Sequence, residues 1–141
     1  MNRKASAVWN GGLKDGNGRI STESGVLRDT QYSFGTRFEN GVGTNPEELI
    51  AAAHAGCFSM ALSGQLGAAS LTADSIETAA TVTLEKKDDG FRVTRVHLVV
   101  EAVVPSASDE QFQTAAENAK KNCPISRLLN AEITMDARLR S

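Results

Sequence analysis

The feature that most constrains the fold is a long run of residues without charge. Positions Leu49 to Ala73 contain no Asp, Glu, Lys or Arg. The run follows Asn45-Pro46-Glu47-Glu48, which supplies a preferred N-cap, a proline at the first helical position and an acidic first turn. A helix that lacks a charged face is usually buried. We therefore predict a buried helix from Pro46 to about Leu66.

The length of this helix indicates a second subunit. At about 1.5 Å per residue the helix is roughly 30 Å long, whereas a chain of 141 residues has a radius of gyration of roughly 14 Å. One small subunit cannot easily enclose it, so we expect a partner subunit to help cover it. Ser, Gly, Gln, Thr and His are scattered along the run, which makes it a poor candidate for crossing a bilayer.

The rest of the chain predicts an α+β fold in a single domain, residues 1–141. With 40% hydrophobic and 23% charged residues, the composition is that of a folded soluble protein. Turn residues, alternation and a Ser108–Gln111 capping box define the other elements. We expect antiparallel strands at Ala5–Trp9, Arg19–Leu27, Gln31–Phe38, Ile76–Lys86, Phe91–Val104 and Glu132–Leu139, a hairpin turn at residues 11–18, and helices from Ser108 to Asn122 and from Pro124 to Asn130.

The net charge and the N-terminal residues argue against charge-driven binding partners and against secretion. The net charge is -2, and no block of five like charges occurs. Binding to nucleic acid or to a membrane surface through charge is therefore not expected. The first residues, Met1-Asn2-Arg3-Lys4, are not followed by an apolar segment, so we expect no secretory signal and a cytoplasmic protein.

Two cysteines, Cys57 and Cys123, are candidates for redox chemistry. A structural disulfide is disfavoured in a reducing cytosol, which leaves two inert thiols or a redox pair. Cys123 precedes Pro124 and is placed as an N-cap, where backbone N–H groups lower the pKa of a thiol. A capping thiol without a redox role fits the same position. Cys57 lies within the long helix, where it is either a core thiol or a reactive one.

Other polar residues have both a structural and a chemical interpretation. His54 lies three residues before Cys57, on roughly the same helix face. It is either a base for the thiol or, more commonly for such a residue, a hydrogen-bonded core side chain. Arg37 alone is typical of a solvated strand residue, and Glu47 of a partner of the helix dipole. The usual short pairs of zinc ligands are missing, so we expect no metal site.

Four segments taken together resemble the OsmC family. The resemblance is to the OsmC branch (osmotically inducible protein C) of the OsmC/Ohr hydroperoxide reductases, and it extends from Trp9 to Leu139. Gly56 stands where Ala is expected in relatives, at no position that matters for the chemistry. The segments are Thr36-Arg37-Phe38, Gly43-Thr44-Asn45-Pro46-Glu47-Glu48-Leu49, Ala52-Ala53-His54-Ala55-Gly56-Cys57-Phe58 and Asn122-Cys123-Pro124-Ile125-Ser126.

The resemblance implies a thiol-dependent peroxidase, an antioxidant enzyme of the stress response. Cys57 is similar to the peroxidatic cysteine, Cys123 to the resolving cysteine, and Arg37 with Glu47 to the charged pair that activates the reactive thiol. The implied fold is an intertwined homodimer in which antiparallel sheets, built from strands of both subunits, wrap two long central helices. The two thiols suffice for the cycle, so no haem, flavin or other cofactor is expected. An external dithiol, such as a lipoylated protein, would restore them.

Helix geometry adds a prediction about the charged pair. Glu47 and Cys57 are ten residues apart, which separates them by roughly 15 Å along a straight helix and by about 80° around it. Glu47 therefore cannot easily serve Cys57 of its own helix. We predict that Glu47 and Arg37 reach Cys57 of the partner subunit.

Two rival functions remain open from the residues. A non-catalytic protein that binds small apolar ligands would use the same helix, with both cysteines in its core. A thioesterase of the hot-dog type has candidate acids in Glu47 and Glu48, but it gives the two cysteines no role. For the peroxidase, the apolar surroundings of Cys57 favour organic hydroperoxides over hydrogen peroxide, because an apolar substrate group gains roughly 25 cal/mol per Å² on burial.

Overall fold

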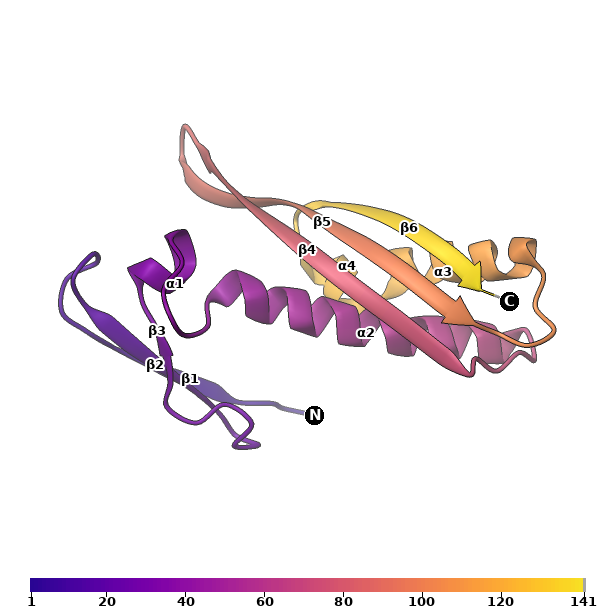
Figure 1. Cartoon of the computed structure of the whole chain (residues 1–141), viewed down its shortest axis with the longest axis horizontal. Helices are drawn as coiled ribbons and strands as arrows, with labels where there is room; N and C mark the ends of the chain where they lie inside the picture. Colours follow the sequence, from indigo (N-terminus) through magenta and orange to yellow (C-terminus); the bar gives the residue numbers. More distant parts are fainter. Residues whose placement is uncertain (141) are drawn as a thin grey trace. The chain divides into compact units, whose positions relative to one another are not determined.

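A computed structural model describes residues 1–140 and confirms a mixed α+β fold (Figure 1). The chain forms two compact units, Met1–Leu49 and a second that begins at Ile50. In chain order the elements of the described residues are β1 (Ala5–Asn10), β2 (Asn17–Thr22), β3 (Thr30–Tyr32), α1 (Phe34–Phe38), α2 (Pro46–Ala68), β4 (Ser75–Lys87), β5 (Gly90–Val103), α3 (Asp109–Asn122), α4 (Pro124–Leu128) and β6 (Glu132–Arg140).

The N-terminal unit holds an antiparallel sheet in the order β1-β2-β3. The predicted turn joins β1 to β2, and Gly11 adopts a φ of 92° there, a conformation that glycine tolerates. The predicted strand Gln31–Phe38 is wrong beyond Tyr32. Ser33 caps α1 through a capping box with Thr36, and this local bonding overrides the strand preference of the aromatic residues. The predicted second strand also stops early, because a turn follows Thr22.

Helix α2 forms as predicted and extends two residues further, to Ala68. Its buried side chains, His54, Phe58, Leu62 and Leu66, recur every four residues and form one stripe. The expectation of a buried helix therefore holds for one face only within this chain. On the other side Met60 is 78% exposed, and a Cβ added to Gly56, Gly64 or Gly67 would meet nothing within 4 Å.

The C-terminal unit holds a second sheet in the order β4-β5-β6. Strands β4 and β5 form the predicted antiparallel hairpin. Strand β6, in contrast, pairs with β5 in parallel, which differs from the predicted antiparallel arrangement. The reason is the connection: α3 and α4 lie between β5 and β6, and a helical crossover returns the chain in the same direction.

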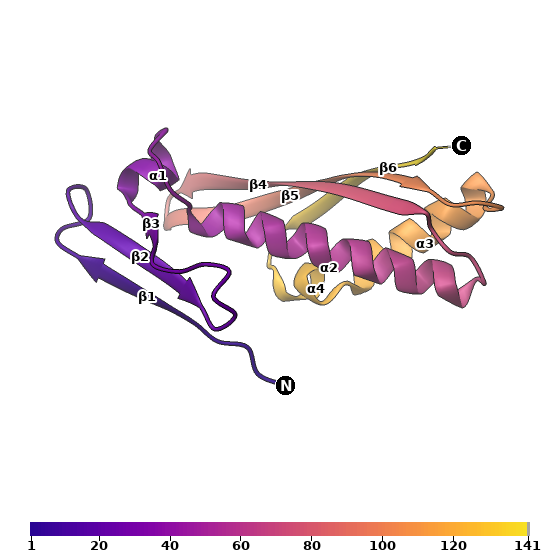
Figure 2. The ribbon, with the colours of Figure 1, turned by 60° about the horizontal axis from the view of Figure 1, so that its bottom comes forward.

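The core of this unit lies between the sheet and a layer of helices. Val96, Leu98 and Val100 of β5 are fully buried on one face of the sheet, as the two-residue period of a strand requires. Figure 2 shows α2, α3 and α4 on the same side of this sheet. Helix α3 begins at the predicted Ser108–Gln111 capping box and adds Phe112 to the same core cluster.

Helix α2 is long and apolar enough to cross a membrane, and it is the one such helix among residues 1–140. Its side chains Phe58, Leu62 and Leu66 belong to the hydrophobic core that β5 and α3 share. This packing is typical of the core helix of a soluble protein.

Candidate active site

The fold brings the two cysteines together across 66 residues of sequence. Cys57 projects from α2 and is partly buried, whereas Cys123 is fully buried at the junction of α3 and α4. Their sulfur atoms lie 2.9 Å apart as free thiols. A disulfide bond is about 2.05 Å long, so oxidation would need the sulfurs to approach by only about 0.9 Å. The arrangement can form and break a disulfide with little movement of the backbone.

The surroundings of Cys57 favour its neutral form. Burial raises the pKa of the Cys57 thiol above its ordinary value, and the neighbouring Cys123 thiol raises this pKa further. A hydrogen bond from the backbone N–H of Ile125 acts in the opposite direction. The thiolate is the nucleophilic form of cysteine, so a reactive Cys57 needs an additional positive charge close to it.

Cys123 occupies the predicted N-cap position without capping the helix. Its backbone N–H ends α3 by donating to the Ala119 carbonyl at 2.9 Å, and Pro124 begins α4. The Cys123 side chain makes no capping hydrogen bond and contacts the Cys57 sulfur instead. The interpretation of Cys123 as a capping thiol is therefore wrong.

Arg37 and Glu47 form a close ion pair within the N-terminal unit. The guanidinium donates from Nε to both carboxylate oxygens of Glu47, at 3.0 and 3.2 Å, and from a terminal nitrogen to Oε1 at 2.6 Å. Two-pronged pairing of this kind fixes the plane of the guanidinium as well as its position. Asn45 connects Thr36 of α1 to Glu48 in the first turn of α2, because its side chain donates to the Thr36 carbonyl and accepts from the Glu48 N–H.

An apolar hollow of about 250 Å³ adjoins this ion pair. Arg37 is one of its lining residues, and the guanidinium carbon lies 5.4 Å from the centre of the Phe38 ring. The aromatic side chains of the lining are Trp9, Tyr32, Phe34 and Phe38. A cation beside apolar walls suits a ligand with an apolar body and a polar or anionic end.

His54 is a hydrogen-bonded core residue. It is fully buried, and its Nε2 lies 2.7 Å from the Ser126 hydroxyl of α4. Burial lowers the pKa of His54 below its ordinary value, so the ring is uncharged at neutral pH. Sequence reasoning gave Ser126 no role within the C-terminal motif. The signal that points to it is its spacing, because His54 precedes Cys57 by three residues and Ser126 follows Cys123 by three.

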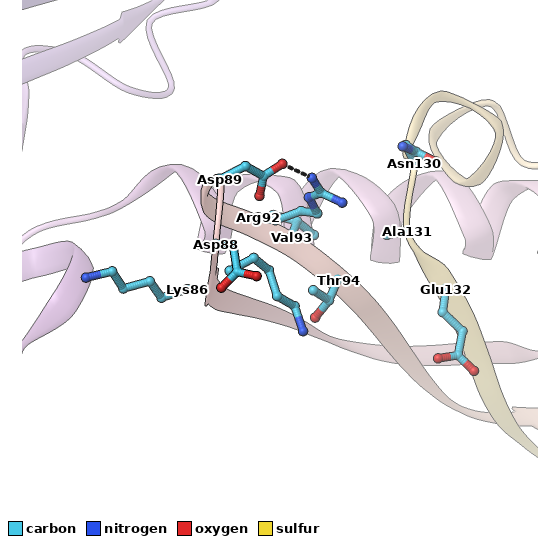
Figure 3. A pocket seen from close by; sticks show the side chains of 10 residues that line it. Lys86, Asp88, Asp89, Arg92, Val93, Thr94, Asn130, Ala131 and Glu132 are labelled. Atoms are coloured by element: carbon cyan, nitrogen blue, oxygen red, sulfur yellow. Dashed lines mark hydrogen bonds and ion pairs between the residues drawn. The ribbon is translucent and has the colours of Figure 1, made fainter.

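A larger hollow, of about 660 Å³, lies elsewhere in the C-terminal unit (Figure 3). It is formed by the tip of the β4–β5 hairpin and the segment from Asn130 to Glu132. Its charged side chains are three basic (Lys86, Lys87, Arg92) and three acidic (Asp88, Asp89, Glu132), with Asp89 and Arg92 paired. The mixed charge and the lack of a cysteine in its lining give it no preference for a peroxide. Among residues 1–140, no group of three or more His, Cys, Asp or Glu side chains could hold a metal ion.

Comparison with known proteins relates the chain to a family of redox proteins. The family model described as OsmC-like protein matches residues 38–138. Peroxiredoxin OsmC of Escherichia coli (strain K12) is 51% identical over 141 residues, which cover 100% of this chain and 99% of that protein. The organic hydroperoxide resistance protein OhrB of Bacillus subtilis (strain 168) is 30% identical over 124 residues, 87% of this chain and 89% of that protein.

Solved structures agree on the fold. The crystal structure of OhrB of Bacillus subtilis superposes with a TM-score of 0.72 at 28% identity and covers 97% of this chain and 98% of that chain. An OsmC-like protein from Mycoplasma pneumoniae has a TM-score of 0.77 at 16% identity, with 100% and 99% covered.

Proposed function

The chain belongs to the OsmC family and is a peroxide-detoxifying enzyme, a peroxidase, and we propose that it reduces organic hydroperoxides through Cys57. The observation that carries the proposal is the 2.9 Å separation of the Cys57 and Cys123 sulfurs. Two thiols at this distance suit a cycle in which one is oxidised by the substrate and the other resolves the product. Cys57, partly exposed, has the role of the peroxidatic thiol, and buried Cys123 that of the resolving thiol.

The proposed cycle has three steps. The Cys57 thiolate attacks the distal oxygen of ROOH, the O–O bond breaks, and RO⁻ leaves and takes a proton to become ROH. This step oxidises the sulfur by two electrons to a sulfenic acid. The Cys123 sulfur then attacks the Cys57 sulfur, which forms the S–S bond and expels the oxygen as water. An external dithiol reduces the disulfide by exchange and is itself oxidised to a disulfide.

Arg37 supplies the positive charge that Cys57 needs, and Glu47 holds Arg37 in place. A guanidinium keeps its charge at all relevant pH values, so it favours the thiolate against the effect of burial. Glu47 and Cys57 both lie on α2, ten residues apart, which corresponds to roughly 15 Å along the helix. We infer that Arg37 and Glu47 act on Cys57 of the partner subunit.

Mixed dimers test this arrangement across subunits. Arg37→Met and Cys57→Ser should each inactivate the protein when present in both subunits. Co-expression in equal amounts gives half mixed dimers, in which one site combines an intact Arg37 with an intact Cys57 of the partner subunit. The mixture should regain about a quarter of the wild-type rate. A mixture without activity, although mixed dimers are shown by mass, would contradict action across subunits.

The homodimer is supported by the uncovered face of α2. Met60 and the glycines at 56, 64 and 67 are exposed there, and small residues allow a second helix to approach closely. We propose an intertwined dimer with sheets around two such helices. Met60→Glu should weaken the dimer, which sedimentation at several concentrations would detect. Its matched control is Leu128→Glu, on the exposed side of α4, and equal dissociation of both variants would contradict the interface.

The substrate, reductant and location complete the proposal. The aromatic hollow beside Arg37 supports a preference for organic hydroperoxides over hydrogen peroxide, because burial of an apolar group contributes roughly 25 cal/mol per Å². The reductant is an external dithiol, for which a lipoylated protein is one candidate, and the location is the cytoplasm, where thiols stay reduced. The family match crosses the boundary between the two units, which supports a single OsmC-like domain over residues 1–141.

Intact mass under non-reducing conditions tests the cycle. An alkyl hydroperoxide should remove two hydrogens from each chain, a dithiol should restore them, and Cys57→Ser should not change. Cys123→Ser should gain one oxygen on Cys57. An unchanged mass in excess hydroperoxide would refute the cycle and favour a protein that binds apolar ligands. Hydrolysis of acyl-CoA that survives in Cys57→Ser would favour a thioesterase.

A further inference from the structure

Two side-chain contacts connect α2 to α4 in the same register. Cys57 and Cys123 form one contact, with 2.9 Å between the sulfurs. His54 and Ser126 form the other, with 2.7 Å between Nε2 and Oγ. His54 and Cys57 are three residues apart on α2 and therefore lie on one face of that helix, so the two contacts lie side by side. Because His54 precedes Cys57 while Ser126 follows Cys123, the helical segments run in opposite directions through the contact.

We propose that the His54–Ser126 hydrogen bond is a redox-inert clamp that holds Cys123 beside Cys57 while the two sulfurs are not bonded to each other. His54 and Ser126 are therefore positioning residues for disulfide formation. This inference rests on the peroxidase cycle proposed above. It goes beyond that cycle by assigning control of the resolving step to two residues outside the cysteines and the charged pair.

Helix α4 is anchored at few points: Ile125 packs against the core while only partly buried, and the Ser126 hydroxyl bonds to His54 of α2. It is only five residues long, and no side chain caps it. A helix this short has no stability of its own. Ser126 is its buried residue, whereas Leu128 is 73% exposed. The bond from Ser126 to α2 therefore adds a polar anchor, beside the apolar packing of Ile125, to the segment that begins with Cys123.

The His54–Ser126 hydrogen bond is strong because both side chains are buried away from water. His54 is fully buried and uncharged at neutral pH, since burial lowers its pKa. With Nε2–H as the donor to the Ser126 oxygen, Nδ1, which has no partner among residues 1–140, keeps only a lone pair. That tautomer avoids an unpaired buried N–H, which is the costlier alternative. Removal of either partner leaves the other unsatisfied in the core.

The clamp matters most after the first oxidation. The oxygen added to Cys57 must fit where the two thiols now touch, so the Cys57–Cys123 contact opens at this stage. The clamp contributes no atom or electron to the resolving step. It keeps the Cys123 sulfur within reach, so that this sulfur attacks Cys57, the S–S bond forms, and the sulfenic oxygen leaves as water with the protons of the two groups. A second hydroperoxide molecule competes and would convert the sulfenic acid to a sulfinic acid.

Ser126→Ala tests the clamp, and Ser59→Ala is its matched control. Ser59 lies on α2, like His54, and its replacement also removes a side-chain bond, to Thr78 of β4 at 2.8 Å, but Ser59 does not connect to α4. Each protein is treated with increasing cumene hydroperoxide. Intact mass then gives the fraction that lost two hydrogens, as the disulfide, and the fraction that gained two oxygens, as the sulfinic acid.

We expect Ser126→Ala to form the disulfide about fivefold more slowly than the wild type, which is the effect of one buried hydrogen bond. The hydroperoxide concentration that diverts half of the chains to sulfinic acid should fall by the same factor. Ser59→Ala and Ser126→Thr, which keeps the hydroxyl, should match the wild type. In a Cys123→Ser background, Ser126→Ala should leave the rate of sulfenic acid formation unchanged.

His54→Met removes the same bond from the other side and tests the clamp independently of the folding of Ser126→Ala. His54→Met should give the same ratio of disulfide to sulfinic acid as Ser126→Ala. The double variant should form the disulfide no more slowly than either single variant. Two results would contradict the clamp while leaving the cycle intact. One is an equal ratio of disulfide to sulfinic acid in Ser126→Ala and Ser59→Ala, and the other is additive effects in the double variant. A wild type that never loses two hydrogens would refute the proposed function itself, and with it the clamp.

Discussion

Oxidation of the Cys57–Cys123 pair should stabilise the chain strongly. A cross-link lowers the entropy of the unfolded state according to the length of the loop that it closes, and here 66 residues separate the cysteines. The chain-entropy relation gives about 4.3 kcal/mol at 25 °C for this loop. The sulfurs are already 2.9 Å apart in the folded state, so little of this gain should be lost to distortion.

The assay compares the reduced and the oxidised protein in urea and by thermal melting. For 141 residues the entropy of unfolding is about 0.3 kcal/mol per degree, so oxidation should raise the melting temperature by about 14 °C. Both forms are measured at one protein concentration, because self-association also shifts stability.

Cys57→Ser, treated in the same way, should not change its midpoint. An equal or lower midpoint for the oxidised wild type would show that the bond closes only by distorting the native fold. The reasoning from the sulfur distance would then be refuted.

Three further predictions concern the pKa shifts and the core. Burial raises the pKa of Cys57 above its ordinary value of 9.0, so the neutral thiol stabilises the folded state below pH 9.0, and this contribution is lost as the pH rises through the higher pKa of the folded state. The reduced chain should therefore lose stability above about pH 9. A urea series in which the stability of Cys57→Ser falls equally steeply with pH would disprove this. Burial lowers the pKa of His54, so its neutral ring stabilises the folded state above pH 6.5, and this contribution is lost as the pH falls through the lower pKa of the folded state. His54→Gln should therefore flatten the decline of the urea midpoint at acidic pH. An unaltered decline would count against this prediction. Phe58→Ala, at a position with no exposed surface, should lower the free energy of unfolding by about 3–5 kcal/mol, and a loss below about 1 kcal/mol would argue against this core.

Elements with strong local signals could be predicted well from the sequence. The start of α2 at Pro46 and the capping box of α3 at Ser108 depend on residues within one turn of each other. The predicted strand from Gln31 to Phe38 is wrong beyond Tyr32 because a local signal in this segment was overlooked. Ser33 and Thr36 form a capping box that the aromatic pattern concealed, and the local bonds decide between the two outcomes.

Some residues of the candidate site could be identified from the sequence, whereas their contacts could not. The resemblance pointed to Arg37, Glu47, Cys57 and Cys123, and the structure adds that Arg37 contacts Glu47 and that Cys57 contacts Cys123. Ser126 could not be recognised as a partner of His54, because 72 residues separate them. A spacing of three in each motif hints at a pair only once the segments are known to meet.

The sequence by itself determined the long apolar helix, its capping and the family to which the chain belongs, because these depend on neighbouring residues and on motifs. Only the tertiary structure decided that β6 runs parallel to β5, that Cys123 turns its sulfur to Cys57 rather than to its own helix, and that one stripe of α2 is buried while Met60 remains exposed. The physical reason is that these features depend on how α3, α4 and the sheet pack on α2. Packing joins residues far apart in the chain, and no local propensity encodes it.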